Sequence, residues 1–214
     1  MPTPWNDDPP GAEPKIVANA RGILHTISQQ ADQRVAPTVA VAQEWHRRLY
    51  KGIELPVPYY AGEIRDADPR YPELDGYEVR VGPFRGVASR LVPQELSSFE
   101  ASAQEAVARL DAALPIGQAP ATSQDLHSVL TLCALLHGEW VRIHPFANGN
   151  GRTARLWANW AALRYALPPF VTIKPRPPAD PYALAAVAGM QGQHQVAVGA
   201  FEQMLRLALR SLNS

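Results

Sequence analysis

The residues best suited to chemistry lie in one short stretch of this 214-residue chain. The stretch reads His144-Pro145-Phe146-Ala147-Asn148-Gly149-Asn150-Gly151-Arg152-Thr153-Ala154-Arg155. Gly149 and Gly151 lack a Cβ, so the backbone there can adopt positive φ angles and approach a ligand closely. A bend of this kind can turn its N–H groups inward as an anion nest. We therefore predict that Gly149, Asn150 and Gly151 bind phosphate.

Two arginines follow these glycines at the start of a predicted helix. Arg152 and Arg155 are three positions apart and share one face of the first turn. The helix dipole disfavours cations at this end by about 0.3–1 kcal/mol, unless an anion lies between them. The free N–H groups of the same turn favour phosphate. The pattern predicts that both guanidinium groups bind phosphate groups of a ligand.

His144 lies five residues before the first of these glycines. An unperturbed histidine has a pKa of about 6.5, so it can be neutral near pH 7 and accept a proton from a hydroxyl. Taken alone, a histidine at a helix end is usually a surface or capping residue, and an Asn-Gly run is usually only a turn. The combination favours a phosphate-transfer site with His144 as the base, whereas Phe146 is expected to bury its ring and fix the loop.

Other motifs with a known chemistry are missing from the sequence. There is no Gly-x4-Gly-Lys-Ser/Thr loop, no His-Glu-x2-His pair and no Gly-x-Gly-x2-Gly after a strand. His137 could share a metal with His144 only if the helix stayed regular, and we do not favour that interpretation. The remaining histidines are predicted to be ordinary residues; they are His25, His46, His127 and His194.

Helices at both sides must position this stretch. Apolar residues at three- and four-residue steps predict helices over 15–31, 38–50, 123–144, 152–167 and 182–212. Ser97 and Ser98 offer N-cap chemistry for a further helix that runs to about Leu114. Pro145 ends the central helix at His144, because a proline disfavours the α conformation in the residue before it. Alternating Tyr and Val with glycines predicts a hairpin over 77–91.

These elements predict a mainly α fold with one small β-hairpin in a single domain. The first fourteen residues contain five prolines and no apolar period, which predicts a disordered tail over 1–14. The domain then covers 15–214, with a core at about 38–170 and C-terminal helices at about 182–212. A proline-rich irregular connection separates the two parts.

Composition excludes several classes of protein. The chain has 20 basic and 20 acidic residues, which argues against binding nucleic acid or an anionic membrane through bulk charge. An apolar share of 46% is too high for a wholly disordered chain. The single cysteine, Cys133, cannot form an internal disulfide, and the sequence has no membrane span and no signal peptide. We therefore expect a soluble cytoplasmic protein.

At the quoted stretch the chain resembles the Fic family, whose signature is His-x-Phe-x-Asp/Glu-Gly-Asn-Gly-Arg-x2-Arg. The matching residues are His144, Phe146, Gly149, Asn150, Gly151, Arg152 and Arg155. The resemblance implies an all-α Fic core and transfer of a nucleoside monophosphate, usually AMP from ATP, to a hydroxyl of another protein.

The resemblance also implies roles for these residues. His144 would be the general base, Gly149 to Gly151 would bind the α- and β-phosphates, and the two arginines would bind the β- and γ-phosphates. The hairpin over 77–91 resembles the flap on which the family holds a target segment by strand addition. The family's inhibitory Ser/Thr-x3-Glu-Gly/Asn motif is missing, so a separate antitoxin or another restraint is expected.

One residue departs from the signature. Asn148 stands where the family has the Asp or Glu that usually holds Mg²⁺, and an amide offers a hard cation only its carbonyl oxygen. A weakened or altered Mg²⁺ site at Asn148 is therefore expected. The alternatives are a Doc-like phosphotransferase, transfer from another donor, and a nucleotide-binding protein without catalysis. Doc-type relatives usually have Ala and Lys at the positions of Gly149 and Gly151, which favours nucleotidyl transfer.

Overall fold

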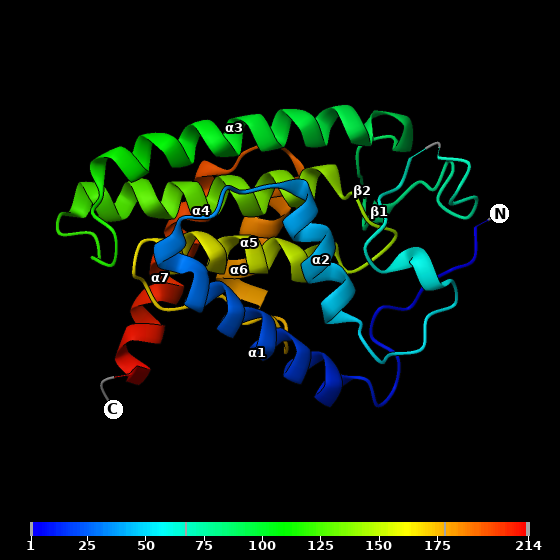
Figure 1. Cartoon of the computed structure of the whole chain (residues 1–214), viewed down its shortest axis with the longest axis horizontal. Helices are drawn as coiled ribbons and strands as arrows, with labels where there is room; N and C mark the ends of the chain where they lie inside the picture. Colours follow the sequence, from blue (N-terminus) through cyan, green and yellow to red (C-terminus); the bar gives the residue numbers. More distant parts are fainter. Residues whose placement is uncertain (1, 67, 178, 213–214) are drawn as a thin grey trace.

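The computed structural model describes residues 2–66, 68–177 and 179–212. Within these ranges the chain forms seven α-helices and one two-stranded antiparallel sheet, which confirms the predicted mainly α fold (Figure 1). The helices are α1 (Glu13–Gln30), α2 (Val39–Leu49), α3 (Val92–Ala113), α4 (Ser123–Ile143), α5 (Asn150–Arg164), α6 (Ala179–Met190) and α7 (Gln195–Leu212). The strands are β1 (Arg80–Val81) and β2 (Phe84–Arg85). Across the described ranges, no helix combines the length and apolar character that a bilayer crossing requires.

Helices α4 and α5 form the centre of the molecule and pack against each other (Figure 1). On one side of this pair, α3 runs along α4. Helices α1 and α2 contact α5, whereas α6 and α7 contact α4. Large aromatic side chains fill the junction: Trp157 packs edge-on against Trp45, with ring centroids 4.8 Å apart, and contacts Phe99 and Trp140. The loop between the two central helices is therefore fixed at both ends by a packed core.

The ends of these two helices follow the sequence as predicted. The hydroxyl of Thr122 accepts the N–H of Asp125 at 3.1 Å and caps the start of α4. Helix α4 ends at His144, which adopts a left-handed conformation with φ of 54° before Pro145. Gly149 has φ of 77° and directly precedes α5. This positive φ is inexpensive only for glycine, so the turn into α5 depends on Gly149.

The prediction that α3 begins at Ser97 and Ser98 is wrong. The helix begins at Val92, with Pro93 in its first turn, where a missing N–H costs nothing. Ser97 and Ser98 lie inside the helix, and their hydroxyls donate to the carbonyl groups of Pro93 and Gln94 at 3.0 and 3.2 Å. Serine hydroxyls can bond backward along a helix in this way, so capping residues alone did not locate the helix start.

The predicted hairpin over 77–91 is present with very short strands. Arg80 pairs with Arg85 and Val81 with Phe84, and Gly82 forms the turn between them with φ of 58°. The N-terminal residues differ from the predicted disordered tail. Trp5 is only 6% exposed, because its ring packs against aromatic side chains of the domain.

Candidate active site

One cavity of about 600 Å³ brings the predicted residues together. It lies where the α4–α5 loop, the first turn of α5, the hairpin and the segment before α6 meet. Every predicted site residue lines it: His144, Asn148, Gly149, Asn150, Gly151, Arg152 and Arg155. The structure thus gathers a potential base, an uncapped helix N-terminus and two arginines around one volume.

His144 is held as a neutral imidazole. Its Nδ1–H donates to the carbonyl of Val141 at 2.8 Å, so the neutral ring carries its lone pair on Nε2. Burial lowers the pKa of His144 to about 4, the hydrogen bond to Val141 raises it and the charge of Arg65 lowers it. The imidazole is therefore unprotonated at neutral pH and able to accept a proton at Nε2.

Arg65 ties the hairpin to the end of α4 from a fully buried position. Its guanidinium donates to the carbonyl groups of His144, Tyr77 and Val87 at 2.7, 2.7 and 2.8 Å and to that of Ile143 at 3.1 Å. Burial lowers its pKa to about 10, which leaves it charged at pH 7. Sequence reasoning did not predict this residue, because all four acceptors are distant carbonyl groups that leave no pattern in the sequence.

His46 fixes the loop after His144. It is buried, stacks on Phe146 with ring centroids 3.8 Å apart, and its Nε2–H donates to the carbonyl of Asn148 at 3.0 Å. Its Nδ1 accepts the N–H of Gly62 at 2.9 Å, and burial lowers its pKa to about 3. His46 was predicted to be an ordinary residue, whereas the structure makes it the neutral residue that connects α2 to the loop.

The side chains of Phe146 and Asn150 close the same loop. Phe146 is fully buried, as predicted. The amide of Asn150 accepts the N–H of Phe146 and donates to its carbonyl, both at 2.9 Å. The Asn150 side chain is therefore used by the fold, and only its main chain at the start of α5 is available to a ligand.

The two glycines differ in their reason for being glycine. A Cβ on Gly149 would collide with the hydroxyl of Tyr50 and lie 2.6 Å from the ring of His46. Gly151 lies inside α5 and does not adopt the positive φ that the sequence suggested. A Cβ there would meet only Arg155 Nη1, at 3.4 Å. Packing within the chain requires Gly149, whereas the open space at Gly151 leaves room for a ligand beside the first N–H groups of α5.

Arg155 is held by neutral groups. Its guanidinium donates to the hydroxyl of Tyr182 at 3.2 Å and to the carbonyl of Ile173 at 2.9 Å. His137 Nε2 lies 2.8 Å from the same hydroxyl, and burial lowers the pKa of His137 to about 3. His137 therefore belongs to a buried network with Tyr182 and Arg155, and this position does not suit it to share a metal with His144.

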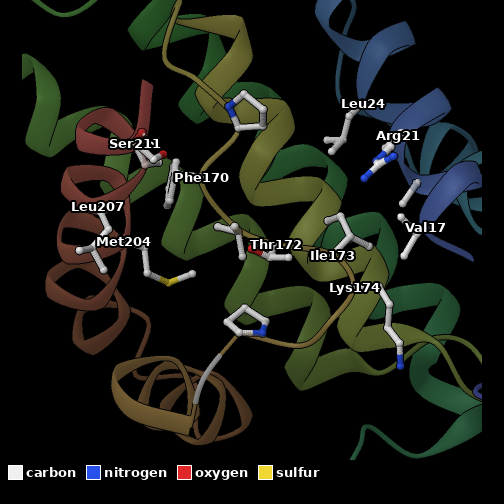
Figure 2. A pocket seen from close by; sticks show the side chains of 15 residues that line it. Val17, Arg21, Leu24, Phe170, Thr172, Ile173, Lys174, Met204, Leu207 and Ser211 are labelled. Carbon is white, nitrogen blue, oxygen red and sulfur yellow. Dashed lines mark hydrogen bonds between the residues drawn. The ribbon is translucent and has the colours of Figure 1, made fainter. Parts of the chain in front are cut away.

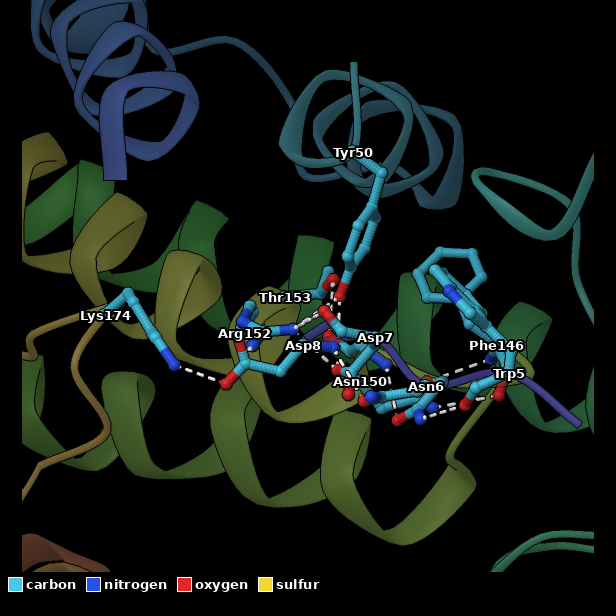
Figure 3. A network of polar contacts seen from close by, with 12 residues as sticks. Trp5, Asn6, Asp7, Asp8, Tyr50, Phe146, Asn150, Arg152, Thr153 and Lys174 are labelled. Atoms are coloured by element: carbon cyan, nitrogen blue, oxygen red, sulfur yellow. Dashed lines mark hydrogen bonds and ion pairs between the residues drawn. The ribbon is translucent and has the colours of Figure 1, made fainter. Parts of the chain in front are cut away.

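Arg152 is held by charged groups of the N-terminal residues. We call residues 3–8 the strap; Figure 3 shows Trp5 to Asp8 of this segment crossing the start of α5. The carboxylate of Asp7 accepts from Arg152 Nη1 at 2.6 Å and its carbonyl accepts from the same atom at 2.8 Å. The hydroxyl of Tyr50 accepts from Arg152 at 2.8 Å and donates to Asp7 at 3.2 Å. The anion predicted beside Arg152 is thus supplied by the chain itself.

The cavity does not fit a resident Mg²⁺ ion. The amide oxygen of Asn148 accepts the N–H of Gly149 at 2.9 Å, and its NH₂ donates to the carbonyl of Trp5 at 2.8 Å. Among the residues that the structure describes, no group of three or more His, Cys, Asp or Glu side chains is placed to hold a metal. This geometry does not support the expected role of Asn148 as a metal ligand. A divalent ion bound to nucleotide phosphates would belong to the substrate.

A second cavity of about 590 Å³ lies between α1, α7 and the segment 169–177 (Figure 2). Val17, Leu24, Phe170, Ile173, Met204 and Leu207 make most of its wall apolar. Its lining contains no histidine and no carboxylate. The residues predicted to act as base and to bind phosphate line the first cavity, and the described lining of this second cavity contains none of them.

The cavity thus combines a neutral histidine, two arginines and the N-terminus of a helix within a helical fold. A family model described as the Fic/DOC family matches residues 37–162, more than half of the chain. The chain belongs to this family, as its signature indicated.

Curated relatives carry the names of nucleotidyl transferases. Protein adenylyltransferase fic-1 of Caenorhabditis briggsae is 31% identical over 129 residues, which cover 60% of this chain and 20% of that protein. Protein adenylyltransferase Fic of Drosophila virilis is 46% identical over 52 residues, 24% of this chain and 10% of that protein. A uridine 5′-monophosphate transferase of Xanthomonas campestris is 36% identical over 66 residues, 31% of this chain and 12% of that protein. The chain thus spans a fifth or less of each relative.

Solved structures share the fold. A Fic-domain-containing signalling protein from Bacteroides thetaiotaomicron aligns over 94% of this chain and 75% of its own, with a TM-score of 0.56 and 17% identity. Fic-1 from Caenorhabditis elegans aligns over 95% of this chain and 55% of its own, with a TM-score of 0.55 and 23% identity. Identities this low establish the Fic-type helical fold and leave the activity to be argued from the site.

Proposed function

We propose that this protein transfers a nucleoside monophosphate, foremost AMP from ATP, to a hydroxyl side chain of another protein. The observation that carries the proposal is the tautomer of His144. Its Nδ1–H is committed to Val141, so Nε2 presents a lone pair to the cavity that also contains Arg152 and the N-terminus of α5. A base and a phosphate-binding turn in one volume are what such a transfer needs.

In the proposed reaction the target hydroxyl oxygen attacks the α-phosphorus of the nucleotide. Its proton moves to Nε2 of His144, the bond from the α-phosphorus to the bridging oxygen breaks, and pyrophosphate leaves. Arg155 and the N–H groups of the first turn of α5 would bind the phosphate oxygens and stabilise their developing charge. No step requires a metal held by this chain's own residues.

The flap would hold the target segment. Each of β1 and β2 has only two residues, and β1 and its neighbours Tyr77 and Glu78 line the cavity beside His144. An extended peptide added to this edge would bring one of its side chains over the base, because alternate side chains of a strand point to one face. Arg65 holds the flap beside His144, because its guanidinium donates to the carbonyl groups of both His144 and Tyr77.

Incubation of the protein with cell extract and ATP labelled in the α- or the γ-phosphate tests the proposal. Label retained on protein from α-labelled ATP, together with a mass increase equal to AMP, is expected. Label from the γ-phosphate alone would instead support the phosphotransferase alternative. Nucleotide binding with no modified product from any donor would support the non-catalytic alternative.

The name of one relative favours a nucleotide other than ATP as a second candidate donor. One of the relatives is a uridine 5′-monophosphate transferase, 36% identical over 66 residues. Parallel incubations with UTP, GTP and CTP would identify the donor by the mass added to the target. A uridylyl increment in place of an adenylyl increment would keep the transfer chemistry and change the nucleotide.

A further inference from the structure

The strap is attached to the domain at its start by contacts of Trp5 and Thr3. The Trp5 ring packs edge-on against Tyr50, with ring centroids 4.8 Å apart, and against His46 at 5.8 Å. The carbonyl of Thr3 accepts the hydroxyl of Tyr60 at 2.8 Å. Burying an indole removes a large apolar area from water, so Trp5 is the anchor that gives the strap a defined position.

The acidic end of the strap, Asp7 and Asp8, lies against Arg152 and Lys174 (Figure 3). Asp7 pairs with Arg152 at 2.6 Å, and Asp8 pairs with Lys174 and lies 3.5 Å from Arg152. The strap therefore places two carboxylates against the cationic groups that line the phosphate end of the cavity. Carboxylate and phosphate oxygens compete for the same guanidinium donors, because both bind the arginine fork with charge-assisted hydrogen bonds.

The contacts of Asp7 and Asp8 can be exchanged for a ligand. The two carboxylate side chains are 23% and 40% exposed, so water and ions reach them. Pro9 and Pro10 follow, and then Gly11 with a φ of 80° just before α1. The acidic end is thus joined to the domain on one side by a turn and on the other by the Trp5 anchor.

Asn148, the residue that departs from the signature, also contacts the strap. Its NH₂ donates to the carbonyl of Trp5 at 2.8 Å. An aspartate at this position could not donate and would set a carboxylate against that carbonyl, close to the strap's own acids. The departure from the family's acidic residue therefore has a structural use in this chain, since an amide accepts the strap and an acid would repel it.

We propose that the strap is a built-in occupant of the phosphate end of the cavity, that a polyphosphate must displace it from Arg152, and that Asn148 holds it in place. The proposal rests on the proposed function, since the displacing ligand is a nucleotide's phosphate chain. The apparent affinity for a polyphosphate is then the intrinsic affinity multiplied by the fraction of molecules whose strap has left. Variants that weaken the strap raise this fraction and tighten binding.

The test measures binding of sodium tripolyphosphate to the full chain by calorimetry. We expect Asp7→Asn to lower the Kd by about 10-fold, the effect of removing one charge-assisted hydrogen bond from the competing state. Trp5→Ala is expected to act in the same direction. Glu13→Gln is the matched control: it removes one exposed negative charge next to the strap and should leave the Kd unchanged. Melting temperatures establish that each variant is folded.

Hydrogen–deuterium exchange in the peptide covering residues 2–12 gives a second readout that does not depend on catalysis. Tripolyphosphate should speed exchange in the wild-type strap, and Asn148→Asp should speed it without any ligand. Equal Kd values for wild type and Asp7→Asn, with exchange unchanged by the ligand, would overturn the strap proposal and leave the proposed transfer intact. Absence of tripolyphosphate binding in every variant would instead remove the phosphate site, and with it both proposals.

Discussion

The two ends of the signature stretch are held in different ways. At the His144 end, the loop is fixed by contacts that the fold makes permanently: the carbonyl of Val141, the buried guanidinium of Arg65 and the stacked ring of His46. At the Arg152 end, the partners are carboxylates of a short N-terminal segment. A ligand cannot replace the first set of contacts, whereas the carboxylates of the second set resemble an anionic ligand.

This difference separates the contacts that orient the proposed base from those that would bind phosphate. The base needs a fixed tautomer and direction, so its contacts are buried and independent of any substrate. A phosphate site needs charges that are free when the ligand arrives, and exposed carboxylates are the groups most easily replaced there. The following predictions test each end, from the largest expected effect to the smallest.

Replacing His144 tests the permanent end most directly. His144→Ala should reduce transfer by roughly 10²–10⁴-fold, because general base catalysis typically contributes that much. Its melting temperature should stay close to that of the wild type, since the ring is only half-buried. The rate is measured as protein-bound label per unit time. His127→Ala, which alters an exposed histidine of α4, is the control, and an unchanged rate in His144→Ala would reject the role of the base.

Arg65→Met should destabilise the same end. The change leaves the carbonyl groups that Arg65 contacts without a donor, and each unsatisfied buried group costs about 1–3 kcal/mol. We expect a loss of at least about 3 kcal/mol in the free energy of unfolding, measured with urea. Arg85→Met, on an exposed residue of β2, should have almost no effect. Equal midpoints for the two variants would show that the flap is not tied through Arg65.

Acid should weaken the contacts of the buried histidines. Burial lowers the pKa values of His46 and His137 to about 3, below the value of about 6.5 in the unfolded chain. The unfolded state therefore binds protons that the native state does not, so stability is lost as the pH falls from about 6.5 toward 3, by up to roughly 1.4 kcal/mol per pH unit for each residue. Urea unfolding at pH 7.5 and 5.5 measures this slope. His46→Asn should flatten it, and a pH-independent midpoint would contradict it.

The smallest expected effect concerns the position of Arg155. Tyr182→Phe removes the hydroxyl that accepts from Arg155 at 3.2 Å and contacts His137, and the net contribution of one hydrogen bond is about 1 kcal/mol. The KM for the nucleotide should rise by about 5-fold with little change in kcat, because the residue positions a binding group. Tyr71→Phe, on a half-buried ring outside the cavity, is the control. A fall in kcat at constant KM would show that Tyr182 acts on the chemical step.

Much of this arrangement could be predicted from the sequence because it depends on local rules. The helix end at His144, the left-handed Gly149 and the buried Phe146 follow from proline, glycine and apolar spacing within a few residues. The start of α3 was misplaced because serine suits both a cap and a helix interior. Local rules are reliable only where one residue type excludes the alternatives.

The contacts that hold the site were not predictable in this way. Arg65, His46 and Asp7 act through partners 79, 102 and 145 positions away, and nothing in their neighbourhoods distinguishes them from surface residues. The strap was mistaken for a disordered tail because prolines and acids are typical of one. A signal was available: Trp5 is a large aromatic residue in a segment that otherwise has none, and such residues seldom stay in water.

The pair Asn148-Gly149 is a sequence that is prone to deamidation. Glycine has no side chain to hinder attack of its main-chain nitrogen on the preceding amide carbon, so an Asn-Gly bond is prone to lose ammonia and yield aspartate and its isomer. Here that ageing reaction would delete the NH₂ group that donates to the Trp5 carbonyl and add a negative charge near the strap's own acids. Stored protein would thus accumulate a form with a loosened N-terminus, and comparing fresh with aged samples would reveal it without any mutation.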